Sequence, residues 1–179
     1  MTGVVVLFSG HRVDEPSRNP PRFPPACEAK AREAIKSVMR DIIKTASGPV
    51  LGIAGAADGG DILFHEVCAE LGVESEVCLV LPPAEYVRTS VQAAWANRFH
   101  RLLQTHPMAI LESDCDDVWL QDHLWQMRRA RDQHPHRTVL VALLEEVGVD
   151  TPGGTSGMVR LAQENSLEVI RLNMREICA

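Results

Sequence analysis

Short apolar runs alternate with amphipathic segments along nearly the whole chain. The run VVVLF at residues 4–8 is continuous, β-branched and aromatic, which is typical of a strand buried on both faces of a parallel sheet. Five further apolar runs of similar length predict five more strands. They lie at residues 49–54, 76–81, 108–111, 138–144 and 168–172.

Between these runs, apolar residues recur every three or four positions, as they do on the buried face of a helix. In residues 27–45, for example, Ala31, Ile35 and Ile42 fall on one face. The same spacing predicts four more helices, at residues 60–71, 89–104, 116–132 and 155–165. This alternation predicts an α/β, Rossmann-like doubly wound fold with a mainly parallel sheet of about six strands and helices on both faces. We expect a single domain over residues 1–179.

Composition and charge narrow the possible partners. Hydrophobic residues make up 45% of the chain and charged residues 23%, which is typical of a globular protein. The 18 basic and 24 acidic residues leave a net charge of −6, which argues against binding of double-stranded nucleic acid. No run approaches the roughly 18 apolar residues that a membrane helix needs, and the first residues do not resemble a signal peptide. We therefore expect no membrane partner.

The cysteines and histidines indicate no metal and no disulfide framework. Five cysteines are scattered along the chain without a C-x-x-C pair, which favours reduced thiols and a cytoplasmic location. Cys115, His123, His134 and His136 form a loose cluster whose spacing matches no zinc template. We expect neither a metal nor a cofactor.

The loop after the first predicted strand is rich in arginine and proline. In an open α/β sheet, ligands bind beyond the carboxyl ends of the strands, so this loop belongs to the candidate site. Residues 10–26 hold Gly10, His11, three arginines and five of the eleven prolines. Guanidinium groups suit phosphate, so we predict that Arg12 faces a phosphate, with Arg22 as the second choice. The alternative is a solvated loop whose arginines pair with acidic residues of the same loop.

The loop after the second strand, GIAGAADGGDILF at residues 52–64, exposes much of its backbone. Unpaired amides at the start of a helix attract anions, so a phosphate is expected there. Asp58 is expected to cap the helix, with Asp61 in a capping-box-like position. The alternative is that the glycines only permit a tight turn. The candidate ligand-binding residues are Gly55, Ala56, Gly59, Gly60 and Asp61.

The segment DTPGGTSGMVRLA, which follows the fifth strand, has the same character. Its glycines and hydroxyls again lead directly into a predicted helix and would form a second anion site. Two such junctions in one small domain favour a phosphate-bearing ligand over turn geometry alone. The candidate residues here are Gly153, Gly154, Thr155, Ser156 and Gly157.

Three pieces of the sequence, SGHRVDEPSRNPPRFP, GAADGGDILFHEV and PGGTSGMVRLAQENSLEVI, resemble the SLOG superfamily of Rossmann-like domains. That superfamily is named for the Smf/DprA proteins and the LOG phosphoribohydrolases, and the similarity is greatest to bacterial domains thought to sense nucleotide-derived signals. The resemblance spans nearly the whole chain. It implies a nucleotide-derived small molecule held between the two glycine junctions, and it leads us to expect a homo-oligomer and a separately encoded effector protein.

The same resemblance implies two alternative functions, a ligand sensor and a hydrolytic enzyme. LOG-type hydrolases carry P-G-G-x-G-T-x-x-E, whose glutamate helps to cleave a base from a ribose phosphate. Here Arg160 stands at the position of that glutamate, which favours binding or sensing. The alternative is a nucleotide N-glycosidase whose carboxylate is Glu66, Asp61 or Asp14. His65, beside Glu66, is a further candidate, for which a surface or cap position is the competing interpretation.

Overall fold

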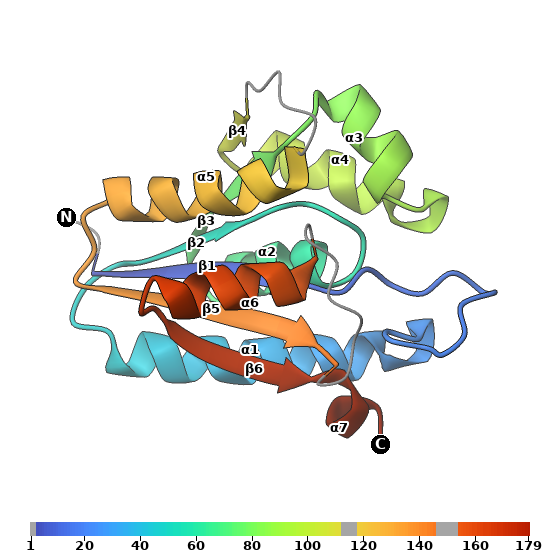
Figure 1. Ribbon diagram of the computed structural model, residues 1–179, viewed down its shortest axis with the longest axis horizontal. Helices are drawn as coiled ribbons and strands as arrows, with labels where there is room; N and C mark the ends of the chain where they lie inside the picture. Colours follow the sequence, from blue (N-terminus) through green and yellow to red (C-terminus); the bar gives the residue numbers. More distant parts are fainter. Residues whose placement is uncertain (1–2, 112–117, 146–153) are drawn as a thin grey trace.

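The computed structural model describes residues 3–111, 118–145 and 154–179. They form an α/β fold with one parallel sheet between two layers of helices, as the alternation of the sequence predicts (Figure 1). Every predicted strand is confirmed to within three residues at each end. The six strands are β1 (Val4–Gly10), β2 (Val50–Ala54), β3 (Glu74–Leu79), β4 (Met108–Ile110), β5 (Arg137–Leu144) and β6 (Glu168–Asn173).

The strands lie in the order β4-β3-β2-β1-β5-β6, and all neighbouring pairs are parallel. From β1 the chain builds outward to β4, then returns to the other side of β1 and continues with β5 and β6. The direction of winding therefore reverses beside β1. In such a sheet, the loops that leave the two central strands diverge and form a crevice at the carboxyl edge.

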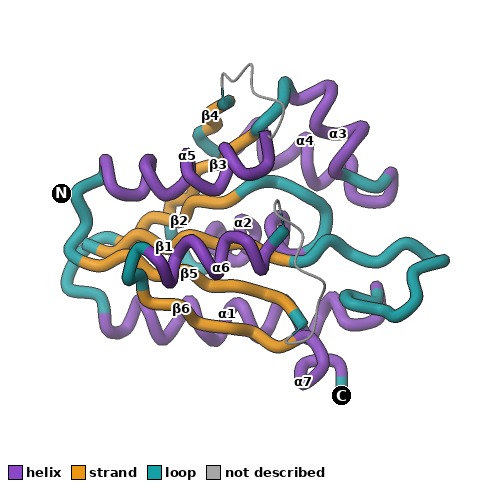
Figure 2. The backbone as a smooth tube through the Cα atoms, viewed as in Figure 1, coloured by secondary structure: helices purple, strands orange, loops and turns teal. Residues whose placement is uncertain are grey.

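Helices cover both faces of the sheet, as Figure 2 shows. Helices α1, α2 and α4 pack on one face, and α5 and α6 pack on the other. The short helices α3 and α7 lie beside the first of these layers. The helices are α1 (Glu28–Thr45), α2 (Gly60–Glu70), α3 (Pro83–Ser90), α4 (Ala96–Thr105), α5 (Val118–Asp132), α6 (Thr155–Glu164) and α7 (Met174–Cys178), with short 3-10 turns at Pro25–Cys27 and Ala93–Trp95.

Strand β1 is buried on both sides, which explains its unbroken apolar sequence. Val4, Val6 and Phe8 point into the core beneath α1 and α2, whereas Val5 and Leu7 point into the core beneath α5 and α6. All five are at most 3% exposed. Burial of each such side chain stabilises the fold by about 1.5–3 kcal/mol. Strand β1 is therefore a firmly held central strand, and it fixes the position of the loop at its carboxyl end.

The predicted helix at 89–104 is wrong in its first part. The chain forms α3 earlier, beginning at Pro83, and is extended at Val91 and Gln92 before the turn that leads into α4. Proline suits the first turn of a helix, which explains why α3 begins at Pro83. The break follows from a tertiary contact, because the amide of Gln92 donates to the Asp58 carboxylate over 2.8 Å and cannot take part in a helix ladder.

The expectation that all the cysteines are reduced is also wrong for one pair. Cys27, just before α1, and Cys178, in α7, form a disulfide with their Cα atoms 5.5 Å apart. Burial raises the pKa of the Cys68 thiol to about 12 and that of the Cys78 thiol further still. The disulfide removes the reason for assigning the chain to a reducing compartment. Within the described segments, none of the helices has the length and apolar character needed to cross a membrane.

Candidate functional site

A cavity of about 420 Å³ opens at the carboxyl edge of the sheet, where the winding reverses. Its wall comes from the loops after β1, β2 and β5, from α3 and α5, and from the first turn of α6. In Figure 1 the arrowheads of β5 and β6 point toward this edge, where the loop after β1 extends from the domain. The cavity brings together nine of the predicted binding residues: Gly10, His11, Arg12, Arg22, Gly55, Asp61, Gly154, Thr155 and Ser156.

The first turn of α6 meets the cavity with its amino end. Gly154 precedes the helix, and its carbonyl accepts hydrogen bonds from the amides of Gly157 (2.9 Å) and Met158 (3.3 Å). Thr155 is 6% exposed, and its hydroxyl oxygen accepts a hydrogen bond from Ser9 over 3.3 Å. Gly157 is buried behind this turn and does not line the cavity. The positive end of the α6 dipole therefore faces the cavity. Gly153 lies outside the described residues.

At the β2–α2 junction, Gly59 and Gly60 pack against the loop after β1 and do not line the cavity. Gly59 has φ +94°, and a Cβ there would lie 2.6 Å from the amide nitrogen of Val13. The amide of Gly60 donates to the carbonyl of His11 over 3.0 Å, and a Cβ on Gly60 would lie 2.8 Å from the Cα of Gly10. These two glycines permit close contact between two loops, so the amide of Gly60 is already paired and is not available to a phosphate.

Asp58 does not cap α2, contrary to the prediction. Its buried carboxylate accepts hydrogen bonds from Arg12, at 2.6 Å from Nε and 3.3 Å from Nη2, and from the amide of Gln92. The remaining guanidinium nitrogen of Arg12 donates to the carbonyl of Thr89 over 3.3 Å. Arg12 reaches the cavity wall, but its charge is largely balanced by Asp58.

Arg22 is held differently. Its main-chain amide and that of Phe23 both donate to the Asp14 carboxylate over 2.8 Å, which fixes the proline-rich loop. The Nε of Arg22 is buried and has no hydrogen-bond partner among the described residues. Burial lowers the pKa of Arg22, and so does the neighbouring charge of Arg18. The structure therefore favours Arg22 over Arg12 as the counter-charge for an anion, the reverse of the order predicted from the sequence.

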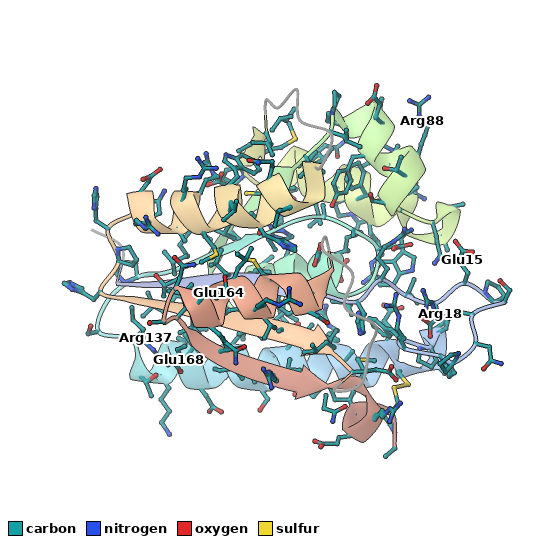
Figure 3. All side chains as sticks on the ribbon, in the orientation of Figure 1. Glu15, Arg18, Arg88, Arg137, Glu164 and Glu168 are labelled. Atoms are coloured by element: carbon teal, nitrogen blue, oxygen red, sulfur yellow. A yellow bond between two sulfur atoms is a disulfide. The ribbon has the colours of Figure 1, made fainter. Side chains whose placement is uncertain are left out.

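A second hollow of about 430 Å³ lies beside the cavity along the loop after β1, and Arg12, Arg18 and Arg22 line it. Arg18 pairs with Asp14 at 3.3 Å, which matches the alternative that arginines of this loop bind acidic residues within it. Figure 3 shows Glu15 and Arg18 on this loop, far from Arg137 and Glu168, which pair at the opposite edge of the sheet. The positive side chains of this loop are thus concentrated at the carboxyl edge.

His11 is a neutral donor at the cavity wall. Its Nε2 accepts a hydrogen bond from the amide of Glu145 over 3.1 Å, so the proton of the neutral ring sits on Nδ1. Burial lowers the pKa of His11 to about 4, with smaller contributions from the charges of Arg22 and Arg18. The imidazole is therefore uncharged at neutral pH and is suited to hydrogen bonding.

Asp61 and Asp122 form an acidic wall on another side of the cavity. Asp61 accepts hydrogen bonds of 3.3 Å from the amides of Gly10 and Ala57, and Asp122 accepts one of 2.8 Å from the side chain of Gln126. Burial raises the pKa of each carboxyl to about 7, and the charge of Asp122 contributes to the shift at Asp61. Asp122, on α5, was not predicted from the sequence as a site residue.

Tyr86 closes the cavity above this acidic wall. Its hydroxyl oxygen accepts a hydrogen bond from the amide of Ala56 over 3.2 Å. Burial raises the pKa of Tyr86 well above 10, and the charge of Asp61 raises it further. A Cβ on Gly55 would lie 2.8 Å from the Asp61 carboxylate and 3.2 Å from the Tyr86 hydroxyl, so glycine is required for Asp61 and Tyr86 to approach this strand end. Ala56 is buried behind it.

Of the three predicted catalytic carboxylates, only Asp61 lines the cavity. Glu66 lies on the outer side of α2, where Arg98 binds both of its oxygens over 2.7 Å. Asp14 is occupied by the main chain of its own loop. The prediction of a functional role at Glu66 or Asp14 is therefore not supported by their positions, because both carboxylates are paired elsewhere in the fold.

His65 is not a surface residue, and it does not line the cavity. It is fully buried in α2, with Nε2 2.9 Å from the carbonyl of Gly55 and Nδ1 2.8 Å from the hydroxyl of Ser75. Burial lowers its pKa to about 4, so it stays neutral and positions the end of β2. Across the described segments, no group of three or more His, Cys, Asp or Glu side chains is arranged to hold a metal ion.

Comparison with known proteins adds little to this picture. No protein-family model matches the sequence, and no curated protein shows significant similarity to it. Among solved structures, the fold is similar to that of DNA processing protein A (DprA) from Streptococcus pneumoniae, at 10% sequence identity and a TM-score of 0.40. The likeness covers 99% of this chain and 60% of that protein. A likeness at this level carries no information on ligand or activity, so the function must be inferred from the cavity.

Proposed function

We propose that the protein binds a nucleotide or nucleotide-derived small molecule in the cavity at the carboxyl edge, and that it senses this ligand without hydrolysing it. The observation that carries the proposal is the meeting of the α6 amino terminus with the unpartnered Nε of Arg22 around one cavity of the described structure. An anion there would gain backbone hydrogen bonds, a favourable helix dipole and a guanidinium donor.

The size and lining of the cavity support a small-molecule ligand. A volume of about 420 Å³ lies within the range of ligand-binding sites, which is roughly 300–1,000 Å³. Phe8 and Met158 supply apolar surface, and His11, Thr155 and Ser156 supply hydrogen-bonding groups. This mixture suits a ligand that combines a flat or apolar part with a phosphate.

Thermal denaturation in the presence of a nucleotide panel tests the proposal. A ligand at about 100 times its dissociation constant stabilises the folded state by about 2.7 kcal/mol. We expect at least one phosphorylated member of the panel to raise the melting temperature, and its unphosphorylated nucleoside to raise it less. The proposal fails if no member of a broad panel, including dinucleotides and cyclic nucleotides, changes the melting temperature.

A nucleotide N-glycosidase is the second candidate, and Asp61 is the observation that favours it. Its carboxyl lines the cavity with a raised pKa, as expected of a carboxyl group that acts in general acid–base chemistry. The residue at the position of the LOG-type glutamate does not decide between the two functions, because Arg160 is exposed and does not line the cavity. Chromatography of nucleotides incubated with the protein separates the two functions. If the wild-type protein releases free base and the Asp61→Asn variant does not, the protein is a hydrolase and the sensor proposal is wrong.

The expected homo-oligomer, the cytoplasmic location and a separately encoded effector belong to the same proposal. A sensor needs a second protein, or a second copy of itself, to receive the signal of ligand binding. Sedimentation analysis with and without the stabilising nucleotide would show whether binding changes the oligomeric state. An unchanged monomer in both conditions would remove self-association from the proposal.

A further inference from the structure

The cavity has two chemically opposite walls. The first turn of α6 and Arg22 make one wall positive, whereas Asp61 and Asp122 make the other acidic. The anion assigned to the first wall does not account for the second wall, because a phosphate beside two carboxylates would be repelled. The acidic wall therefore needs a different part of the ligand as its partner.

Among the described residues, none pairs a positive charge with either carboxylate of the acidic wall. The hydrogen bonds to Asp61 come from main-chain amides, and the bond to Asp122 comes from the amide of Gln126. Neither Asp61 nor Asp122 forms an ion pair with any residue in the described segments. The nearby cation Arg12 is bound by Asp58. Both side chains are partly exposed to the cavity. Two carboxylates that share one cavity without a cation repel each other, so their presence there indicates a role toward a ligand.

We propose that Asp61 and Asp122 bind the hydroxyl groups of the ligand's sugar, so that the ligand of this cavity is a ribonucleotide and its deoxy counterpart is discriminated against. This inference rests on the proposed function, since it assigns the sugar of a ligand whose phosphate lies on the opposite wall. The two walls then orient the ligand along one direction, with its phosphate at α6 and its sugar at α2 and α5.

A hydroxyl group suits this wall better than a cation does. Burial raises the pKa of both carboxyls to about 7, so near neutral pH the pair holds part of its protons and offers both donors and acceptors. A hydroxyl group both donates and accepts, whereas an ammonium group only donates. Tyr86, Gln126 and His123 also line the cavity beside this wall. Glu145 interacts instead with Arg22 and Arg175. Arg12, the arginine whose charge acts on Tyr86, is paired with Asp58.

Calorimetric titration with matched sugars tests the inference. The probes are the four ribonucleoside 5′-monophosphates and their 2′-deoxy counterparts, titrated into the wild-type protein. Loss of a hydrogen bond to a charged or partly charged acceptor weakens binding by about ten- to hundredfold. We expect each ribonucleotide that binds to be preferred by that factor over its 2′-deoxy counterpart.

Asp122→Asn is the informative variant, and Asp132→Asn is its matched control on an exposed turn of the same helix. The Asp122→Asn variant should lose most of the preference for ribose by binding the ribonucleotide more weakly, while its affinity for the deoxynucleotide stays close to that of wild type. The control should keep the full preference.

Four outcomes are decisive. Equal binding of ribo- and deoxyribonucleotides by the wild-type protein would overturn this inference and leave the proposed function standing. Binding of neither series, together with the absence of any thermal shift in the nucleotide panel, would overturn both. A clear ribose preference that survives in Asp122→Asn would remove Asp122 from the sugar site. If that variant does not fold, the same titration of Asp61→Asn decides whether the acidic wall carries the preference.

Discussion

Replacement of Asp122 by asparagine should raise the free energy of unfolding relative to wild type. The gain should be small near pH 4 and should grow as the pH rises toward 7. An asparagine at this position would keep the shape of the aspartate and an oxygen that can accept the hydrogen bond from Gln126. The pKa of the Asp122 carboxyl is about 7 in the fold, against an ordinary value of 3.8. Between these values the folded state holds more protons than the unfolded state, so the free energy of unfolding falls as pH rises.

The magnitude follows from the same two values. At about 1.36 kcal/mol for each pH unit, the interval from 3.8 to about 7 corresponds to at most about 4 kcal/mol at pH 8. At pH 4 the carboxyl is protonated in the folded state and about half ionised in the unfolded state, so the two proteins should differ by less than about 1 kcal/mol. The charge of Asp122 also raises the pKa of Asp61, so its removal relieves that repulsion in addition.

Urea denaturation followed by tryptophan fluorescence at pH 4.5, 6 and 8 measures the difference. His11 and His65 also titrate differently in the folded and unfolded states, but they do so in both proteins and cancel in the comparison. Asp132→Asn, on an exposed turn of α5, should show no pH-dependent gain. A variant at position 122 that is no more stable than wild type at pH 8, or equally stabilised at pH 4.5, would refute the raised pKa of this carboxyl group.

Three further predictions concern the frame of the site. Arg12→Ala should lower the free energy of unfolding by about 2–3 kcal/mol, because Asp58 is left buried without its cation. The loss is smaller than for a fully buried pair because the Arg12 side chain is 42% exposed; unchanged urea denaturation would contradict this. Gly60→Ala should cost about 1–3 kcal/mol in the same assay, because its Cβ would lie 2.8 Å from the main chain of β1; a wild-type midpoint would show that the two loops separate easily. Thiol titration of the denatured protein should find two fewer free thiols before reduction than after, owing to the disulfide between Cys27 and Cys178; equal counts would exclude that bond.

The sheet could be predicted from the sequence because each strand is a short apolar run that needs burial on both faces. The alternation of these runs with amphipathic segments leaves few arrangements other than a parallel α/β sheet. The helix at 89–104 failed because its break is tertiary. Asp58 lies 34 residues before Gln92 in the sequence and binds its amide, and no local pattern reports that contact.

The candidate site was predictable at the level of its loops and less so at the level of its residues. Glycines at 59 and 60 correctly indicated close approach of the main chain, but the partner is the loop after β1 and not a ligand. Asp122 was missed because an aspartate in the middle of a helix is typical of a solvated polar position. Only the packing of α5 over β1 brings it to the cavity. The one available signal was Gln126, one helical turn later, which can hold such a carboxylate.

The order of the arginines could not be derived from sequence for the same reason. Arg12 is nearest to the end of β1, and proximity to the strand was the basis for choosing it first. Its partner Asp58 is 46 residues away in sequence. Arg22 is placed by Asp14, which holds the main chain of the loop, and Arg22 lines both the cavity and the hollow beside it.

Calorimetric titration of the Arg22→Gln variant at low salt tests most directly whether the cavity binds a phosphate-bearing nucleotide. The matched control is Arg88→Gln, since Arg88 is exposed on α3 and extends from the outer side of the domain in Figure 3. A charge-assisted contact contributes about 1.5–3 kcal/mol, so Arg22→Gln should weaken binding of the stabilising nucleotide by about ten- to hundredfold while the control matches wild type. The affinity for the corresponding nucleoside, which lacks the phosphate, should be the same in all three proteins. Equal affinity of wild type and Arg22→Gln for the nucleotide would contradict the account.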